Sequence, residues 1–180
     1  PDPVEYHYDA AVDFTPKWRP DEILPEDKAP GLLNPDKEYH FFDYGLNSLR
    51  SILRPRENYT LFRSVYLLWD NSPRRKNGGG NILLHATPER FRTFLTNVSS
   101  LAVEELPAEE RFVFINAWNE WAEGTHLEPC KKYGYLFLQI CKDILGMSPD
   151  AIKNASMTPE CRSWLYEKSE PRPLIAEEEE

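Results

Sequence analysis

The strongest constraint on the fold is an alternation of two apolar, strand-like runs with two amphipathic helical segments. Residues 61–69 and 111–118 are short, aromatic and β-branched runs of nearly continuous apolarity, as expected for strands buried on both faces. Residues 87–102 and 133–145 repeat apolar side chains at the helical period. This order predicts an α/β fold with parallel strands. With three or four strands, the chain makes at most half of a (β/α)8 barrel, which usually needs about 250 residues.

Local signals mark the ends of both predicted helices. Thr87 is a favourable N-cap, Pro88 suits the first helical position, and Glu89 lies in the first turn. Gly146 stands where the C-terminal cap of the second helix belongs. These signals predict that the first helix begins at Pro88 and that the second ends before Gly146.

The other segments are less regular. Residues 9–14 predict a short strand, and residues 41–53 predict a helix with four apolar side chains on one side, namely Phe42, Leu46, Leu49 and Leu53. Prolines recur about every five residues across residues 15–37, so we expect a long, irregular, Pro-rich loop there. We expect a partial barrel domain over residues 1–146 and, over residues 147–180, a C-terminal extension with an acidic tail.

Composition and charge argue against several classes of function. The net charge of −9 argues against a nucleic-acid partner, and no apolar run reaches the roughly 18 residues of a membrane span. On a helix, Cys130 and Cys141 would lie about 16 Å apart, too far for a disulfide. This slightly favours a cytoplasmic environment over the secretory pathway. Cys and His are not at ligand spacing, so we expect no metal and no cofactor.

The densest chemistry follows the second predicted strand, where residues 118–129 hold three carboxylates and two tryptophans. In an extended strand Glu120 and Glu123 would face opposite sides, whereas on a turn their Cβ atoms would lie about 5–6 Å apart. Gly124 favours the turn. Two carboxylates held close can divide into a general acid and a base, as glycosidic bond cleavage requires. The alternative is a solvated helix face with no catalytic role.

Neighbouring side chains extend this candidate site. Trp118 and Trp121 offer flat apolar faces that suit the C–H faces of a sugar ring, and Asn119 and Glu128 offer polar groups beside them. We therefore predict that these four residues contact the substrate. His126 is either a further contact of this kind or a structural hydrogen-bonding partner.

The first predicted strand also ends in a cluster that could bind sugar hydroxyls. It combines an aromatic ring, an acid, an amide and a guanidinium in Trp69, Asp70, Asn71 and Arg74. The alternative is an Asp–Arg ion pair that fixes the Gly-rich loop behind it. Arg74 and Arg75 together also indicate an anion site, such as one for the phosphate of a sugar nucleotide.

The segment at residues 114–129, together with residues 9–16, 69–75 and 87–89, strongly resembles the WbsX-type proteins, known as polysaccharide-biosynthesis glycosyltransferases. These are related to glycoside hydrolase family 99, the endo-α-mannosidases. The resemblance covers about residues 8–145 and implies the C-terminal portion of a (β/α)8 TIM-like barrel. It also implies an oligosaccharide or polysaccharide substrate and an N-terminal half of the barrel that is missing here.

The resemblance further implies roles for single residues. The hydrolase relatives are metal-independent retaining enzymes in which the first Glu of the motif activates the 2-hydroxyl of the sugar. The second Glu is the general acid and then the base. By motif, Glu120 takes the first role and Glu123 the second, while Trp69 and Arg74 match substrate-side residues.

The function we expect is hydrolysis of an α-mannoside-like linkage, because a close carboxylate pair is hydrolase chemistry. One alternative is glycosyl transfer in the assembly of cell-surface polysaccharide, including lipopolysaccharide. It requires a nucleotide- or lipid-phosphate site, for which Arg74 and Arg75 are candidates. Another alternative is a carbohydrate-binding fragment without turnover, which would not need the carboxylate pair.

Overall fold

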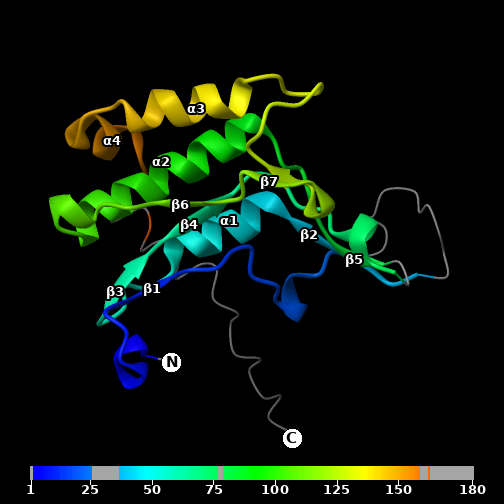
Figure 1. Ribbon diagram of the computed structural model, residues 1–180, viewed down its shortest axis with the longest axis horizontal. Helices are drawn as coiled ribbons and strands as arrows, with labels where there is room; N and C mark the ends of the chain where they lie inside the picture. Colours follow the sequence, from blue (N-terminus) through cyan, green and yellow to red (C-terminus); the bar gives the residue numbers. More distant parts are fainter. Residues whose placement is uncertain (1, 26–36, 77–78, 159–161, 163–180) are drawn as a thin grey trace, which may run out of the picture.

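The computed structural model describes residues 2–25, 37–76, 79–158 and 162 (Figure 1). Within them the longer helices are α1 (Tyr44–Leu53), α2 (Pro88–Glu105), α3 (Leu136–Leu145) and α4 (Pro149–Ala155). The strands are β1 (Ala10–Val12), β2 (Tyr39–Asp43), β3 (Thr60–Phe62), β4 (Ser64–Tyr66), β5 (Gly80–Leu84), β6 (Phe114–Asn116), β7 (Asn119–Glu120) and β8 (Thr125–His126).

Three pairs of strands are parallel, and each pair joins segments distant in sequence. β1 pairs with β3, β4 with β6, and β2 with β5. Arg63 alone separates β3 from β4. The carbonyl of Phe62 accepts a hydrogen bond from Asp13 N at 2.9 Å, and that of Arg63 accepts one from Phe114 N at 3.1 Å. Because successive carbonyls of an extended chain point to opposite sides, residues 60–66 run between β1 and β6.

The parallel pair of β2 and β5 and the small hairpin of β7 and β8 lie near the carboxyl end of β4. β5 is connected to the segment after β4 through Leu83 N, which donates to the carbonyl of Trp69 at 2.9 Å. β7 and β8 form an antiparallel hairpin directly after β6. The structure therefore confirms a mixed α/β fold with parallel strand pairs, while the barrel stays a prediction.

The helices and strands enclose one apolar core. α2 packs against α1, β4, α3 and α4, and Figure 1 shows α3 and α4 outside α2, away from the strands. The largest fully buried side chains come from α1, β4 and the residue after it, α2 and α3, namely Tyr44, Tyr66, Leu67, Phe91, Phe94, Leu95, Ile140 and Ile144. As predicted, Thr87 caps α2 by accepting a hydrogen bond from Arg90 N, and Gly146 caps α3.

The predicted helix over residues 41–53 was wrong in its first three residues. Phe41 and Phe42 belong to β2, and the helix begins at Tyr44 because the Asp43 carboxylate caps it, accepting a hydrogen bond from Leu46 N at 2.9 Å. The buried side of α1 is partly polar, since Asn47 is buried and accepts a hydrogen bond from Tyr66 Oη at 2.7 Å. Of the predicted apolar stripe, Phe42 and Leu53 are buried, whereas Leu46 and Leu49 are only partly buried.

The predicted strand over residues 111–118 shortens to β6, and it is not buried on both faces. Phe112 is 56% exposed and Phe114 is 44% exposed. Both rings contact Phe62 across the sheet, at centroid distances of 5.7 and 6.1 Å. Within the described residues β6 pairs on one edge only, and this aromatic face of the sheet has no helix over it.

The two irregular segments predicted from the sequence are described only in part. Residues 15–25 are irregular apart from one short turn, η2 (Pro20–Glu22), and residues 26–36 of the Pro-rich loop lie outside the described residues. Past residue 147 the chain forms α4, which Ser148 caps. The backbone of Met157 then donates to the buried Asn97 of α2 at 2.9 Å. The acidic tail lies outside the described residues.

Candidate functional site

The segment after β6 turns sharply and carries both candidate carboxylates. Glu120 ends β7, the 3₁₀ turn η6 (Trp121–Glu123) follows, and Gly124 closes the turn in the left-handed conformation at φ +68°. Glu120 is thus the residue just before the turn, and Glu123 is the last residue of the turn. The turn that the sequence favoured over an extended strand is therefore present.

Glu123 connects this turn to the segment that follows β4. Its carbonyl accepts a hydrogen bond from Asp70 N at 2.8 Å, and its carboxylate forms an ion pair with Arg74 at 2.5 Å. The close approach requires glycine next to Glu123, because a Cβ on Gly124 would lie 3.2 Å from Asp70 N. The residues that follow β4 and β6 are thus joined into one wall.

Glu120 has a different environment from Glu123. Its backbone pairs with Thr125 in the hairpin, and its side chain is partly exposed. Within the described part of the chain, this side chain forms no ion pair and no side-chain hydrogen bond. One carboxylate of the pair is therefore engaged by a guanidinium, and the other is free to meet a ligand.

A large open hollow, of about 910 Å³, lies beside this wall. It is lined by residues 68–70, 82–86, 121, 124, 126 and 129–133, and we call it the hollow below. Of the residues predicted from the sequence, the lining contains Trp69, Asp70, Trp121 and His126. Glu120 and Glu123 are not among the lining residues, so their catalytic roles stay predictions.

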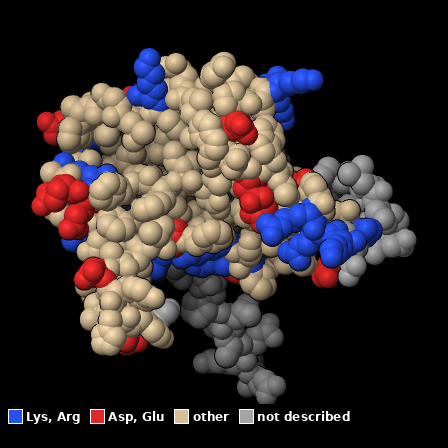
Figure 2. Space-filling view, in the orientation of Figure 1, with Lys and Arg blue, Asp and Glu red and all other residues tan. Residues whose placement is uncertain are grey.

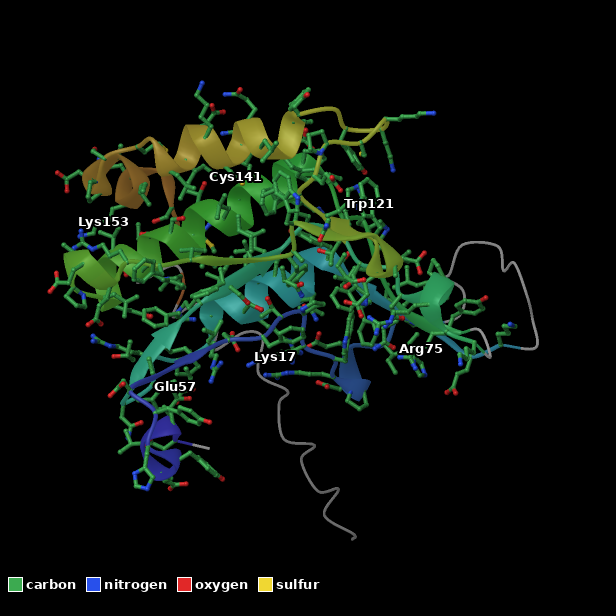
Figure 3. The ribbon with its side chains drawn as sticks, viewed as in Figure 1. Lys17, Glu57, Arg75, Trp121, Cys141 and Lys153 are labelled. Carbon is green, nitrogen blue, oxygen red and sulfur yellow. The ribbon has the colours of Figure 1, made fainter. Side chains whose placement is uncertain are left out.

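Trp121 and His126 form one stacked unit in the hollow. Their ring centroids lie 3.7 Å apart with the planes inclined by 19°, and Trp121 Nε1 donates a hydrogen bond to Glu128 at 2.7 Å. Trp121 is 49% exposed, so its ring offers a free surface, and Figure 3 shows its position relative to Arg75. The predicted flat aromatic face is present at this residue, and Glu128 acts by orienting it.

His126 is almost completely buried under this stack. Burial lowers the pKa of His126, and the nearby Gly124 backbone and Glu128 carboxylate offset this only in part. Within the described residues neither ring nitrogen makes a hydrogen bond of standard geometry, and neither does Nε1 of the buried Trp69. The neutral imidazole is therefore favoured near pH 7.

Asp70 and Asn71 fix the loop after β4. Asp70 Oδ1 accepts hydrogen bonds from Ser72 N at 3.0 Å and Ser72 Oγ at 2.6 Å. The buried Asn71 accepts one from Asn81 N at 2.9 Å. One alternative from the sequence was an Asp–Arg ion pair at the Gly-rich loop. The structure has an ion pair there, but Arg74 pairs with Glu123 rather than with Asp70.

The remaining predicted contacts lie away from the hollow. Trp118 is 52% exposed and does not line it, and Asn119 is an exposed residue of β7. Arg74 and Arg75 also lie outside the lining, and Arg74 is engaged by Glu123. The structure therefore brings Trp69, Asp70, Trp121 and His126 together and leaves these four residues apart from them.

Sequence reasoning missed three polar residues that do line the hollow. His85, at φ +61°, pairs with Asp43 at 2.7 Å, while Lys131 and Lys132 stand on a tight turn before α3. Two adjacent lysines after the motif of residues 114–129 were a visible signal. Nothing in the sequence showed that they would face the segment after β4.

Neither a metal site nor a membrane-spanning helix is present among the described residues. Among the residues that the structure describes, no three His, Cys, Asp or Glu side chains gather where they could hold a metal ion. In the same part of the chain, none of the helices combines the length and apolarity that crossing a bilayer needs. Cys130 and Cys141 are free thiols, as expected.

Comparison with known proteins identifies relatives of this chain. Residues 1–141 match the family described as Glycosyltransferase WbsX. The chain is 40% identical over 151 residues to two proteins called uncharacterized protein WxcX, from Xanthomonas campestris pv. campestris strains B100 and ATCC 33913. Each alignment covers 83% of this chain and 21% of the relative, so the chain spans about a fifth of their length. No solved structure matches the chain.

Proposed function

The chain belongs to the WbsX glycosyltransferase family, and on that basis we propose that it binds a saccharide in the hollow and contributes to glycosyl transfer in polysaccharide assembly. The observation that carries this proposal is the wall shared by the hollow and the η6 turn. It combines the exposed ring of Trp121 with a carboxylate-bearing turn at the carboxyl ends of parallel strands. Functional groups of α/β proteins gather at that end of the strands.

The different environments of the two carboxylates favour transfer over hydrolysis. A hydrolase of the kind that the sequence suggested needs Glu123 as a proton donor. In the structure the carboxylate of Glu123 is instead engaged by the Arg74 guanidinium at 2.5 Å. Transfer from an activated donor needs less help for its leaving group, and the base it needs is available in Glu120.

The proposed reaction is a displacement at the anomeric carbon of a donor sugar. The acceptor hydroxyl oxygen forms a bond to that carbon while the bond from the carbon to the leaving-group oxygen breaks. The leaving group departs with the bonding electron pair, and the proton of the hydroxyl passes to the carboxylate of Glu120. Arg74 keeps Glu123, and with it the η6 turn, in place.

Hydrolysis of an α-mannoside-like linkage is the second candidate, and one observation favours it. Glu120 and Glu123 flank one tight turn and are three residues apart, a spacing that would suit a pair of cooperating carboxylates. This candidate requires Arg74 to release Glu123 when substrate binds.

We also propose that the parallel strands form part of a (β/α)8 barrel. Parallel sheets are normally covered on both faces. Within the described residues, the face that carries Phe62, Phe112 and Phe114 has no helix over it. Further strands on the free edge of β6 would cover these rings, and the greater length of the relatives is consistent with such strands.

Saccharide binding to the full chain tests the proposed function. A panel of hexoses and short oligosaccharides is titrated against it, with binding followed by tryptophan fluorescence and by saturation-transfer NMR. We expect binding of at least one member, with the NMR contacts on one sugar face. Trp121→Ala should weaken this binding at least tenfold, because it removes the exposed ring of the hollow.

The matched control is Tyr6→Ala, which also removes an exposed aromatic ring but lies in the N-terminal turn η1 (Pro3–Tyr6). It should bind like the unaltered chain. The proposal fails if no saccharide binds, or if Trp121→Ala binds as well as Tyr6→Ala does.

A further inference from the structure

The turn that carries Lys131 and Lys132 is held at both ends. Gly134 N donates to the carbonyl of Cys130 at 2.7 Å, which closes the turn. Before it, Leu127 N donates to the carbonyl of Ala117 at 2.9 Å. The two lysines therefore extend from a fixed backbone rather than from a free loop.

Tyr133 anchors the other side of the same turn. Its ring packs edge-on against Phe137 of α3 at a centroid distance of 5.0 Å, within the main core. Lys132 Nζ lies 4.9 Å from the centre of this ring, an arrangement that holds an ammonium group in place. The Tyr133 ring thus joins the apolar core to the lysine side of the hollow.

The charge at the hollow is opposite to the charge of the whole chain. The chain carries −9, yet the lining contains both lysines and one carboxylate, that of Asp70, whose Oδ1 already binds Ser72. Among the described residues no carboxylate lies within ion-pair distance of Lys131 or Lys132. In Figure 2 basic side chains project at the upper right, above the segment that precedes α3.

Two ammonium groups without a carboxylate partner among the described residues, beside apolar and aromatic walls, favour a particular class of ligand. A phosphate monoester carries about two negative charges near pH 7 and three acceptor oxygens, whereas a carboxylate carries one charge. Two lysines therefore match a phosphate in charge. The exposed ring of Trp121 and the partly exposed ring of Tyr133 would meet the C–H faces of an attached sugar.

We infer that the hollow takes a glycosyl phosphate, with Lys131 and Lys132 binding the phosphate and Trp121 meeting the sugar ring. This rests on the proposed function, and it names the donor class of that same site. A phosphate at the anomeric carbon is also a good leaving group, because its oxygen carries the departing electron pair as a stable anion. Arg74 and Arg75, the phosphate candidates from the sequence, have no part in this site.

The test compares each sugar with its own 1-phosphate on the full chain. The probes are glucose, mannose and galactose and their three 1-phosphates, measured by calorimetry at low and at 0.5 M salt. At least one 1-phosphate should bind about tenfold or more tightly than its parent sugar at low salt. High salt should reduce this preference, because exposed charges are screened.

The variant Lys131→Gln/Lys132→Gln should remove the preference, so that each 1-phosphate binds no more tightly than its parent sugar does to the same variant. Its matched control is Lys142→Gln/Lys153→Gln, which removes the same charge from exposed positions on α3 and α4. Figure 3 shows Lys153 at the opposite end of the molecule from Trp121. The control should retain the preference.

The outcomes distinguish a failure of this inference alone from a failure of the proposed function. The inference is overturned if the 1-phosphates bind no better than their parent sugars, or if the preference survives in Lys131→Gln/Lys132→Gln. The proposed function still stands in both cases, because parent sugars bind. If no probe of either kind binds, the proposed function and the inference fail together.

Two further probes distinguish the sources of the phosphate. Uridine diphosphate glucose represents a nucleotide donor, and farnesyl phosphate represents a lipid carrier. Whichever competes with the bound 1-phosphate, and loses that ability in Lys131→Gln/Lys132→Gln, identifies the source. Competition by neither probe would contradict the assignment of a donor to this hollow.

Discussion

Replacing Arg63 should destabilise the chain more than any other single loss of charge, because this side chain pins the central strand segment to two helices. Arg63 is 4% exposed and stands between β3 and β4. Its guanidinium donates to both carboxylate oxygens of Glu105, at 2.9 and 3.0 Å. It also donates to the carbonyls of Ser51 and Arg54, both at 3.2 Å. The cation thus lies at the C-terminal ends of α1 and α2, where the helix dipole favours positive charge.

The expected loss in the free energy of unfolding comes from the Glu105 carboxylate, which Arg63→Met leaves without its partner. Breaking a buried ion pair by removing one partner costs about 3–5 kcal/mol, because the other charge stays uncompensated. The side chain of Glu105 is 15% exposed and keeps some contact with water, so we expect the lower figure, about 3 kcal/mol. Since 1 kcal/mol shifts the Tm of a chain of this size by about 2–4 °C, the Tm should fall by about 6–12 °C.

Thermal and urea unfolding followed by circular dichroism measure this loss. The double variant Arg63→Met/Glu105→Leu should recover most of it, because replacing both partners with apolar groups leaves no buried charge. The control is Arg56→Met, since Arg56 is exposed and makes one hydrogen bond to the backbone of Glu105; we expect a loss below about 0.5 kcal/mol. A loss below about 1 kcal/mol in Arg63→Met, or simple additivity in the double variant, would refute the reasoning.

Three further predictions concern the site and the open sheet face. Because burial lowers the pKa of His126, the unfolded chain binds more protons than the folded chain below about pH 6.5, so stability should fall on acidification there. Urea titrations should show that stability depends less on pH in His126→Phe than in the unaltered chain. Phe112→Ser/Phe114→Ser should reduce self-association in light scattering with little change in Tm, and unchanged association would contradict an exposed apolar face. Glu120→Gln should slow transfer about 10²–10⁴-fold. Under hydrolysis, by contrast, Glu123→Gln would lose most activity on substrates with poor leaving groups.

The parts of the fold that the sequence predicts well are those determined by neighbours in the chain. Thr87, Pro88 and Glu89 begin α2 through contacts within one turn, and Gly146 ends α3 in the same way. The turn at Gly124 is also local, since only the left-handed conformation of this residue is needed. Each of these predictions depends on residues at most four apart.

Features that depend on distant partners were predicted less well. The run Phe41-Phe42 fits a strand and a helix equally, and its pairing with β5, about 40 residues away, decides for the strand. Likewise β6 is apolar enough to be buried, but its exposure depends on what lies over the sheet. Periodicity contains no information on either point.

Contacts in the candidate site also depend on partners that are distant in the sequence. Arg74 and Glu123 are 49 residues apart, and either could have paired with a closer residue of opposite charge. One alternative from the sequence paired Asp70 with an arginine. In the structure the Asp70 carboxylate instead accepts hydrogen bonds from the backbone N and the hydroxyl of Ser72. Lys131 and Lys132 became candidates only when the structure placed them around the same hollow as Trp69.

The asymmetry of the η6 turn bears directly on the reaction. Glu123 uses its carbonyl to hold Asp70 and its carboxylate to hold Arg74, so its contacts are those of a structural residue. Within the described residues, the side chain of Glu120, just before the turn, has no ion-pair or hydrogen-bond partner. A turn with one engaged and one free carboxylate offers a single free group to a reacting hydroxyl, as the proposed transfer requires. A glycosyl phosphate bound by Lys131 and Lys132 would be a donor for that reaction, so the proposed donor and the proposed role of Glu120 are compatible.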